Sequence, residues 1–328
     1  MHDIQSLLLE TVKTKTNPHL SYVEELASLL DISRDSVYRR IRGETDLTIH
    51  ETLKICEHYH ISLHELNQEE SNLFSFSFRR MDREQFNLHD WLKSILGNLE
   101  FILKYQGPIE LVYYTKDLPV FYYFNYPNLA RFKFYFWMKT LLHYPEYERS
   151  KYHQELVPKE LIELGSRVWT KYCSVPSTEI WGEETINVTF KQIEYYLDCG
   201  YFEDSLDAVK IMDEFEQLIK DSREYMISGN KPGGGAELQI YKNDILIGDN
   251  SILFKLGEQR IAFIPMGNLS ILSTTNEVFT EHLETFFTNI IKRSIRISTT
   301  GEKERNKYFN ELMDNYRVVR KRMFPSGH

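Results

Sequence analysis

The sequence has few cysteines, no long apolar run and no excess of positive charge. Its three cysteines, Cys56, Cys173 and Cys199, include no Cys-x-x-Cys spacing, which predicts reduced thiols and gives no support for a zinc site. No segment approaches the ~20 apolar residues that cross a bilayer. Residues 1–13 carry acids among their leucines and lack a basic start, unlike a secretory signal peptide. We therefore expect a cytoplasmic protein with no membrane partner.

Motifs of common enzyme classes are also missing. The glycine-rich residues 231–235 are not followed by Lys-Ser or Lys-Thr and do not match Gly-x-Gly-x-x-Gly, which favours a turn or hinge over a phosphate loop. There is no Gly-x-Ser-x-Gly, and no cysteine has an obvious histidine partner. His58 and His60 lie two apart, so a helix directs them to different faces rather than toward one metal. We expect no enzyme activity, no cofactor and no metal.

The charge of the chain is unevenly distributed. A formal net charge of -9 argues against a protein that coats nucleic acid non-specifically. Affinity for DNA depends, however, on the charge of the docking face. Between residues 33 and 43 a single acid stands against four arginines, in a module that is otherwise acidic: Asp35 against Arg34, Arg39, Arg40 and Arg42. This local excess of three positive charges singles out one short segment.

Residues 4–66 are expected to form short helices with tight connections. The apolar spacing predicts helices at about 4–13, 22–30, 34–42 and 48–60, and a short fifth turn ending near residue 66. Ser21, with Glu24 in capping-box position, and Ser33 are the expected N-caps of the second and third helices. Gly43 is expected to end the third helix. The fourth helix is expected to bury a set of apolar side chains: Ile49, Leu53 and either Ile55 or Cys56.

The second and third helices have the spacing of a helix-turn-helix. Ala27 is small enough for a close helix crossing, and Ile32 and Val37 fill the angle between the two helices. Val37 and Ile41 lie four apart and face inward. Such a wedge presents its outer helix to a major groove about 12 Å wide.

Several short stretches in this segment resemble the Cro/cI-type (XRE) helix-turn-helix. The resemblance covers about a fifth of the chain and is carried by Leu26-Ala27, Ile32-Ser33-Arg34, Ser36-Val37, Arg42-Gly43, Leu53-x-Ile55 and Ile61-Ser62-Leu63-x-x-Leu66. Residues 36–44, SVYRRIRGE, are similar to BetR-like regulators of Bacteroidetes type. Two positions depart from the family pattern, because Asp31 stands in place of the usual turn glycine and Ile41 in place of a frequent glutamate.

The resemblance implies a sequence-specific transcriptional regulator whose residues 33–43 lie in the major groove. It implies base contacts from Arg34, Asp35 and Arg39, the arginines to guanine and the aspartate to cytosine. Ser36, Tyr38, Arg40 and Arg42 are better placed for phosphates. The expected partner is double-stranded DNA, bound by a homodimer because one small module makes few contacts. A solvated helix and a protein-binding helix-turn-helix remain the alternatives for this segment.

The remaining chain is expected to form a larger domain. Residues 1–70 are assigned to the helix-turn-helix domain, and residues 71–88 to a connector or edge strand, because residues 73–78 alternate between apolar and polar. Residues 89–328 predict an α/β or α+β domain, in which helices surround a small central sheet and two long helices end the chain. The aromatic stretches at 121–124 and 132–137 are expected in its core, with a ring-lined pocket or dimer seam as the alternative.

The C-terminal part has a faint resemblance to the sensor domains of TrmB-type regulators. It is carried by residues 273–277 and by Phe286-Phe287-x-x-Ile290-x-x-Arg293-Ser294. Those domains have a phospholipase-D-like fold, whose catalytic form needs His-x-Lys, and none of the 11 histidines here is followed two residues later by lysine. The resemblance implies a non-catalytic domain that senses an unidentified small-molecule or protein effector, or makes the dimer. A phosphoesterase-like enzyme and an interaction scaffold are the alternatives.

Overall fold

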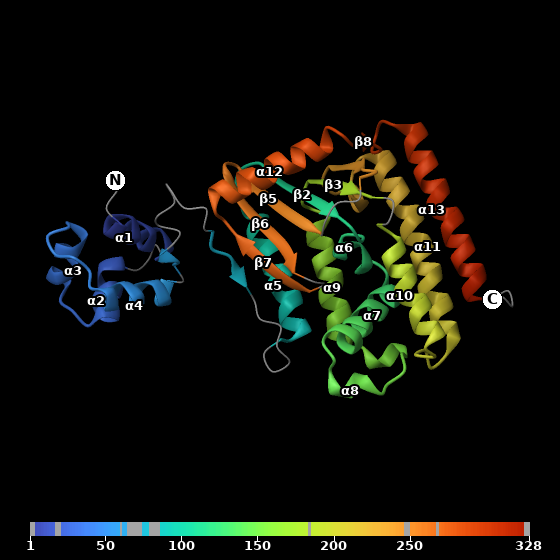
Figure 1. Cartoon of the computed structure of the whole chain (residues 1–328), viewed down its shortest axis with the longest axis horizontal. Helices are drawn as coiled ribbons and strands as arrows, with labels where there is room; N and C mark the ends of the chain where they lie inside the picture. Colours follow the sequence, from blue (N-terminus) through green and yellow to red (C-terminus); the bar gives the residue numbers. More distant parts are fainter. Residues whose placement is uncertain are drawn as a thin grey trace. The chain divides into compact units, whose positions relative to one another are not determined.

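The computed structural model describes residues 4–16, 21–59, 61–63, 74–78, 86–182, 185–245, 250–266 and 269–324. It divides into two compact units, Met1–Phe76 and Ser77–His328 (Figure 1). Within the described ranges no helix is long and apolar enough to span a membrane.

The described part of the first unit is helical, as the sequence predicts. Its helices are α1 (Ile4–Lys15), α2 (Tyr22–Leu30), α3 (Arg34–Ile41) and α4 (Ile49–Tyr59). They enclose a small apolar core with central residues Leu8, Val12, Leu26, Val37 and Ile55. The fifth turn predicted to end near residue 66 falls largely outside the described residues.

Two local predictions for this unit are wrong. The side chain of Ser21 makes no capping hydrogen bond to α2. The side chains of Ile49 and Leu53 are 82% and 48% exposed, whereas Ile55 and Tyr59 are buried. Residues 53 and 55 lie on nearly opposite sides of a helix, so both cannot face one core, and the core is filled by the stripe that contains Ile55 and Tyr59.

The second unit is built on one mixed sheet of eight strands, wider than the small sheet expected. In spatial order the strands are β1 (Ser77–Phe78), β7 (Ser270–Thr274), β6 (Gln259–Met266), β5 (Ser251–Leu256), β2 (Ile109–Thr115), β3 (Ser177–Trp181), β4 (Leu238–Lys242) and β8 (Ile295–Arg296). Strands β2, β3 and β4 are parallel, and all other pairings are antiparallel. The unit therefore combines helices with a mixed sheet, in keeping with the α/β or α+β domain expected for this part of the chain.

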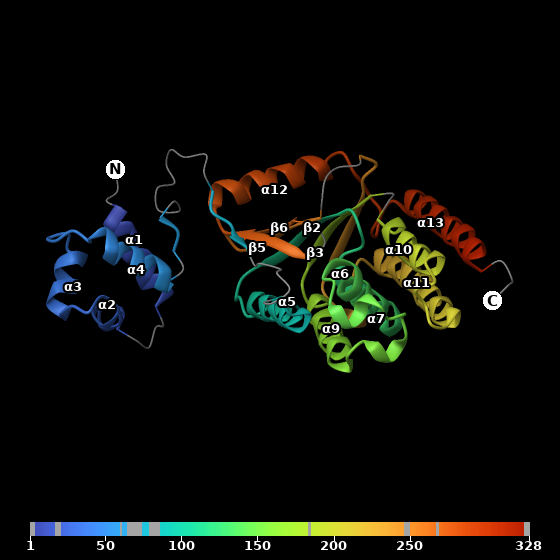
Figure 2. The same ribbon diagram turned by 60° about the horizontal axis from the view of Figure 1, so that its bottom comes forward.

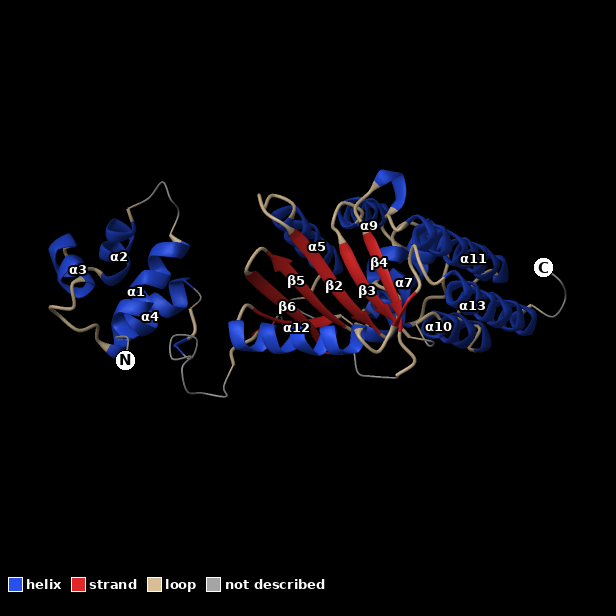
Figure 3. Cartoon of the chain, turned by 90° about the horizontal axis from the view of Figure 1, so that it is seen from above, coloured by secondary structure: helices blue, strands red, loops and turns tan. Residues whose placement is uncertain are grey.

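Helices cover the two faces of this sheet unequally. Of the helices in the described residues, only α12 (Glu277–Ile291) lies over one face (Figure 2), where Leu283, Phe287 and Ile290 pack on β2, β3 and β5. The main core lies on the other face (Figure 3). Its helices are α5 (Leu88–Ile102), α6 (Val120–Tyr123), α7 (Pro127–Phe136), α8 (Pro145–Glu148), α9 (Lys159–Tyr172), α10 (Asn187–Asp198), α11 (Ser205–Ser228) and α13 (Glu302–Met323), with a π-helical turn at Trp137–Leu141 after α7.

The aromatic stretches lie in the main core, as predicted. Every ring of residues 121–124 and 132–137 is buried. The rings stack across elements, with centroids 4.3 Å apart for Phe121 and Tyr172 and 5.5 Å apart for Phe124 and Phe134. Such ring pairs have preferred geometries and stabilise the core beyond the effect of the apolar area that they bury.

A carboxylate and an ammonium group are buried within this aromatic core. The Glu179 carboxylate accepts hydrogen bonds from Trp181 Nε1 at 2.8 Å and from the hydroxyls of Tyr122 and Tyr172. Lys231 Nζ donates to the carbonyl oxygens of Tyr172 (2.9 Å) and Val175 (2.7 Å) and to Ser177 Oγ (2.6 Å). It also lies 3.3 Å from the centroid of the Tyr172 ring. Tyr172 thus links the two ionisable groups.

Burial shifts both of these groups toward their neutral forms. It raises the pKa of Glu179, against the opposing charge of Lys231. It lowers the pKa of Lys231 to about 7, against the opposing charge of Glu179. The two groups therefore depend on each other inside a medium that disfavours an isolated charge.

Candidate nucleic-acid interface

The turn between α2 and α3 has the backbone geometry that the helix-turn-helix pattern predicts. Asp31 lies in the left-handed region, at φ 55° and ψ 48°, which aspartate tolerates better than most residues. The backbone N–H of Ile32 donates to the carbonyl of Ala27 at 3.1 Å. Aspartate at the usual glycine position is therefore compatible with the reversal of the chain.

Both ends of α3 are fixed as expected. The Ser33 hydroxyl accepts a hydrogen bond from the N–H of Ser36 at 3.2 Å, and Gly43 follows the helix with φ 71°. Val37 is 1% exposed and belongs to the core of the unit, with Ile41 partly buried beside it. The helix is therefore held by caps and by its inner face, which leaves the outer face to solvent.

A glutamine that sequence reasoning missed holds the loop after α3. Gln5 Nε2 donates to the carbonyls of Arg40 (2.8 Å) and Thr45 (3.0 Å), and Gln5 Oε1 accepts from the N–H of Leu47 (2.7 Å). A single amide in α1 thus ties down a loop some forty residues further along the chain. No local sequence signal marks such a long-range contact.

Arg40 belongs to the structure of the unit rather than to its free surface. Its side chain is 14% exposed and pairs with Glu51, with Nη2 2.8 Å from Oε1 and Nε 3.4 Å from Oε2. Nη1 also donates to the carbonyl of Ser36 at 3.1 Å. Since all these donors are engaged, Arg40 is poorly suited to the phosphate contact that we expected from it.

Glu51 joins Arg40 to the start of α4. Its carboxylate accepts from the N–H of Thr48 at 2.8 Å, while the N–H of Glu51 donates to the Thr48 hydroxyl at 3.2 Å. This reciprocal pair is a capping box, and the sequence signal Thr-x-x-Glu could have revealed it. The hydrogen bonds from Arg40 and Thr48 lower the pKa of Glu51, against the effect of burial.

The other predicted contact residues lie on or beside the outer face of α3. Arg34, Asp35, Tyr38, Arg39 and Arg42 are exposed, and Ser36 is half-buried. Arg34 Nη2 lies 2.6 Å from Glu24 Oε1. In the described part of the chain the side chain of Arg39 makes no hydrogen bond or ion pair. The helix thus brings together a set of polar side chains in which Arg39 is available to a partner.

Arg42 is paired with an acid that follows it closely. Arg42 Nε lies 2.7 Å from Glu44 Oε1, and Nη2 lies 3.1 Å from Oε2. This hydrogen-bonded contact lowers the pKa of Glu44, to which the charge of Arg39 also contributes, and raises that of Arg42. Glu44 therefore occupies the guanidinium group that a phosphate would need.

These pairs reduce the local excess of positive charge. Residues 33–43 contain four arginines and one acid. Three of the arginines pair with acids outside that window, namely Glu24, Glu44 and Glu51, so the group as a whole has four arginines and four acids. Its positive field is weaker than the sequence window suggests, and DNA would have to compete with the two exposed partners, Glu24 and Glu44.

Comparisons of the chain with protein-family models, with curated proteins and with solved structures give no match.

Proposed function

We propose that the chain is a sequence-specific DNA-binding transcriptional regulator, with α3 in the major groove and a C-terminal unit that senses a signal, forms the dimer, or does both. The strongest support comes from α2 and α3, which are joined through Asp31 in the left-handed conformation. On the outer face of α3 the side chain of Arg39 is exposed and makes no hydrogen bond or ion pair with any described residue. A capped, well-anchored helix with a free arginine is what base contact in the major groove requires.

The contacts divide among the residues of α3. Arg34, Asp35 and Arg39 contact bases, whereas Ser36, Tyr38 and Arg42 contact phosphates. Arg40 acts as a positioning residue through Glu51. Two such modules in a homodimer bind half-sites that are a helical turn apart, because one module buries too little surface for tight specific binding.

The Arg39→Ala variant is expected to lose discrimination at one base pair, at a cost of about 1–3 kcal/mol. The bound sequence is first selected from a random duplex pool with the full chain. Titrations of that duplex and of its single-base variants then locate the affected position. A variant that still distinguishes the selected duplex from a scrambled one as well as the wild type does would remove Arg39 from the base contacts.

Arg42→Ala is the matched control for that experiment. It should weaken binding to all duplexes alike and reduce the salt slope by about one unit, since it removes a phosphate contact. Arg39 and Arg42 differ by three positions in the same segment, so a similar effect of both substitutions on every sequence would contradict the division of roles.

The Glu44→Gln variant is expected to bind all duplexes more tightly than the wild type, most clearly at low salt. The change releases Arg42 from its exposed partner and removes a negative charge that repels the phosphate backbone. Titration of specific and scrambled duplexes at two salt concentrations measures the effect. Glu57→Gln, an exposed acid of α4, removes the same charge without touching Arg42, and an equal gain from both variants would show that only net charge matters.

A further inference from the structure

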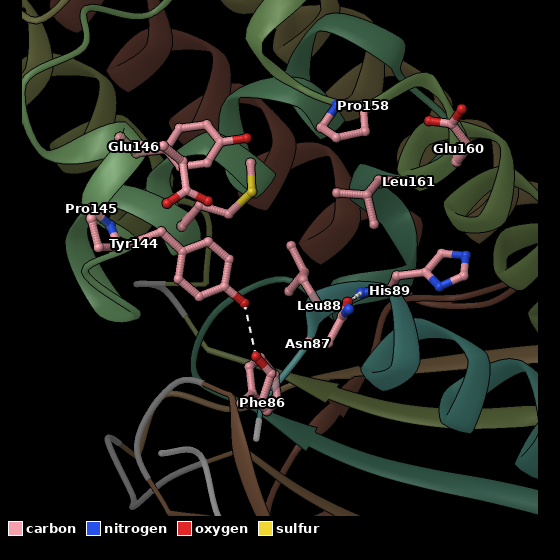
Figure 4. A pocket seen from close by; sticks show the side chains of 12 residues that line it. Phe86, Asn87, Leu88, His89, Tyr144, Pro145, Glu146, Pro158, Glu160 and Leu161 are labelled. Atoms are coloured by element: carbon pink, nitrogen blue, oxygen red, sulfur yellow. Dashed lines mark hydrogen bonds between the residues drawn. The ribbon is translucent and has the colours of Figure 1, made fainter. Parts of the chain in front are cut away.

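A cleft of about 620 Å³ opens on the helical side of the second unit. It lies between the start of α5, the segment from Met138 to Tyr147 and the start of α9 (Figure 4). Its volume lies within the range of about 300–1,000 Å³ that holds small organic molecules. The buried side chains that line it are apolar or aromatic: Phe86, Leu88, Met138, Tyr147 and Leu161. Such a lining favours a ligand with a hydrocarbon part.

Two tyrosines of the cleft already use their hydroxyl groups. Tyr144 Oη donates to the carbonyl of Phe86 and Tyr147 Oη to the carbonyl of Leu156, both at 3.0 Å. Their ring centroids lie 6.3 Å apart. Since these hydroxyls already donate to the backbone, the tyrosines offer a ligand mainly their rings, which attract cations.

The charged side chains of the cleft are mostly acidic. Glu146 and Glu160 are exposed and lie on opposite sides of the opening (Figure 4), and neither makes an ion pair with any described residue. The one basic side chain in the lining is that of His89, which lies 3.8 Å from Asp90. Burial raises the pKa of the Tyr144 and Tyr147 hydroxyls, and the charge of Glu146 raises it further. The Glu146 carboxylate is therefore available to a cationic group in this part of the cleft.

We propose that this cleft binds an amphipathic organic cation, in which an ammonium group is attached to a hydrocarbon chain. The ammonium group lies near Glu146 and the rings of Tyr144 and Tyr147, where opposite charge and the ring quadrupoles both attract it. The hydrocarbon chain packs on Met138 and Leu161. A carboxylate of the same length would meet two acids, and an uncharged alcohol would gain only the apolar contact.

The cleft also includes Phe86, whose carbonyl is held by Tyr144 just before α5 begins. A ligand in the cleft therefore contacts the residues that lead into α5. An effect of the ligand on DNA binding rests on the proposed function, whereas binding of the ligand itself does not.

Calorimetric titration of the full chain with hexylamine, 1-hexanol and hexanoate, in the absence of DNA, tests the proposal. At neutral pH the amine is protonated, and it is expected to bind about tenfold more tightly than the alcohol, while hexanoate gives no measurable heat. Glu146→Gln should weaken binding of the amine about tenfold and leave binding of the alcohol unchanged. Glu163→Gln, an exposed acid of α9 outside the cleft, should change neither.

Three results would overturn the proposal. They are equal binding of the alcohol and the amine, wild-type binding of the amine by Glu146→Gln, and absence of binding by linear primary amines of four to ten carbons. Because Glu146 is exposed, its substitution leaves the fold intact. Because no DNA is present, failure here is distinct from failure of the DNA-binding proposal.

Discussion

Below pH 7, where Lys231 keeps its proton, the Lys231→Met variant is expected to lower the free energy of unfolding of the second unit by about 3–5 kcal/mol, the usual cost of removing one member of a buried charge pair. Methionine matches the size of the lysine stem but removes all three hydrogen bonds donated by Nζ. It also removes the positive charge that opposes the burial of Glu179. The three acceptors then lose this donor inside the aromatic core, while the Glu179 carboxylate keeps its hydrogen bonds and loses only the nearby positive charge.

Urea unfolding measures this loss through tryptophan fluorescence, because all four tryptophans lie in the second unit. The double variant Lys231→Met, Glu179→Gln should recover part of the loss, since it no longer buries an unbalanced carboxylate. If the single variant unfolds within 1 kcal/mol of the wild type, Lys231 does not compensate Glu179.

The pH dependence of stability gives a second measure of the same pair. The pKa of Lys231 is about 7 in the folded unit, below its ordinary value of 10.5. Between these values the unfolded chain binds the proton and the folded unit does not. The contribution of Lys231 to stability therefore rises with pH from about 7 toward 10, by at most about 1.4 kcal/mol per pH unit. This rise should be absent in Lys231→Met, and a wild-type slope in that variant would assign it to another group.

The Glu51→Ala variant is expected to destabilise the first unit by about 2–4 kcal/mol. The substitution opens the capping box of α4 and leaves the guanidinium group of Arg40, which is 14% exposed, without its acid. For a unit of this size such a loss is a large fraction of the total stability. The amides of α3 and α4 should exchange hydrogen faster, as measured by mass spectrometry, and specific DNA binding should fall with them.

Glu57→Ala on the same helix is the matched control, because Glu57 is exposed and makes no ion pair with any described residue. Arg40→Ala separates the two roles considered for that arginine. As a positioning residue it should reproduce the faster exchange of Glu51→Ala. Wild-type exchange in Arg40→Ala, combined with weaker binding to all duplexes, would instead place Arg40 among the phosphate contacts.

The first unit was largely predictable because its signals are local. Ser33 and Gly43 bracket α3 within eleven residues, and Val37 marks its inner face. What the sequence did not reveal depends on contacts between distant segments, such as Gln5 with Thr45. The charge of the arginine-rich window was overestimated for the same reason, since Glu24 and Glu51 lie outside it.

In the second unit the presence of a sheet among helices was predictable, and the central strand β3 was not. Strand β3 reads Ser-Thr-Glu-Ile-Trp, and its central glutamate suggests an exposed segment. The structure instead buries Glu179 completely, because two tyrosines and a tryptophan donate hydrogen bonds to its carboxylate. No sequence pattern indicates that these three side chains donate to Glu179. The cleft near α8 was equally hidden, because its walls come from three separate segments, residues 86–89, 138–147 and 158–161.

The pairing of β2 with β5 sets an order of events during synthesis. Ile109 pairs with Leu256 in the central part of the sheet, so that part stays incomplete until the chain has grown past residue 256. The first unit draws its core from residues before Phe76. At about 5–20 residues per second, the ribosome needs roughly ten to forty seconds to add the intervening stretch. During that interval α3 already has the partners that hold it, while the sheet of the second unit is still incomplete.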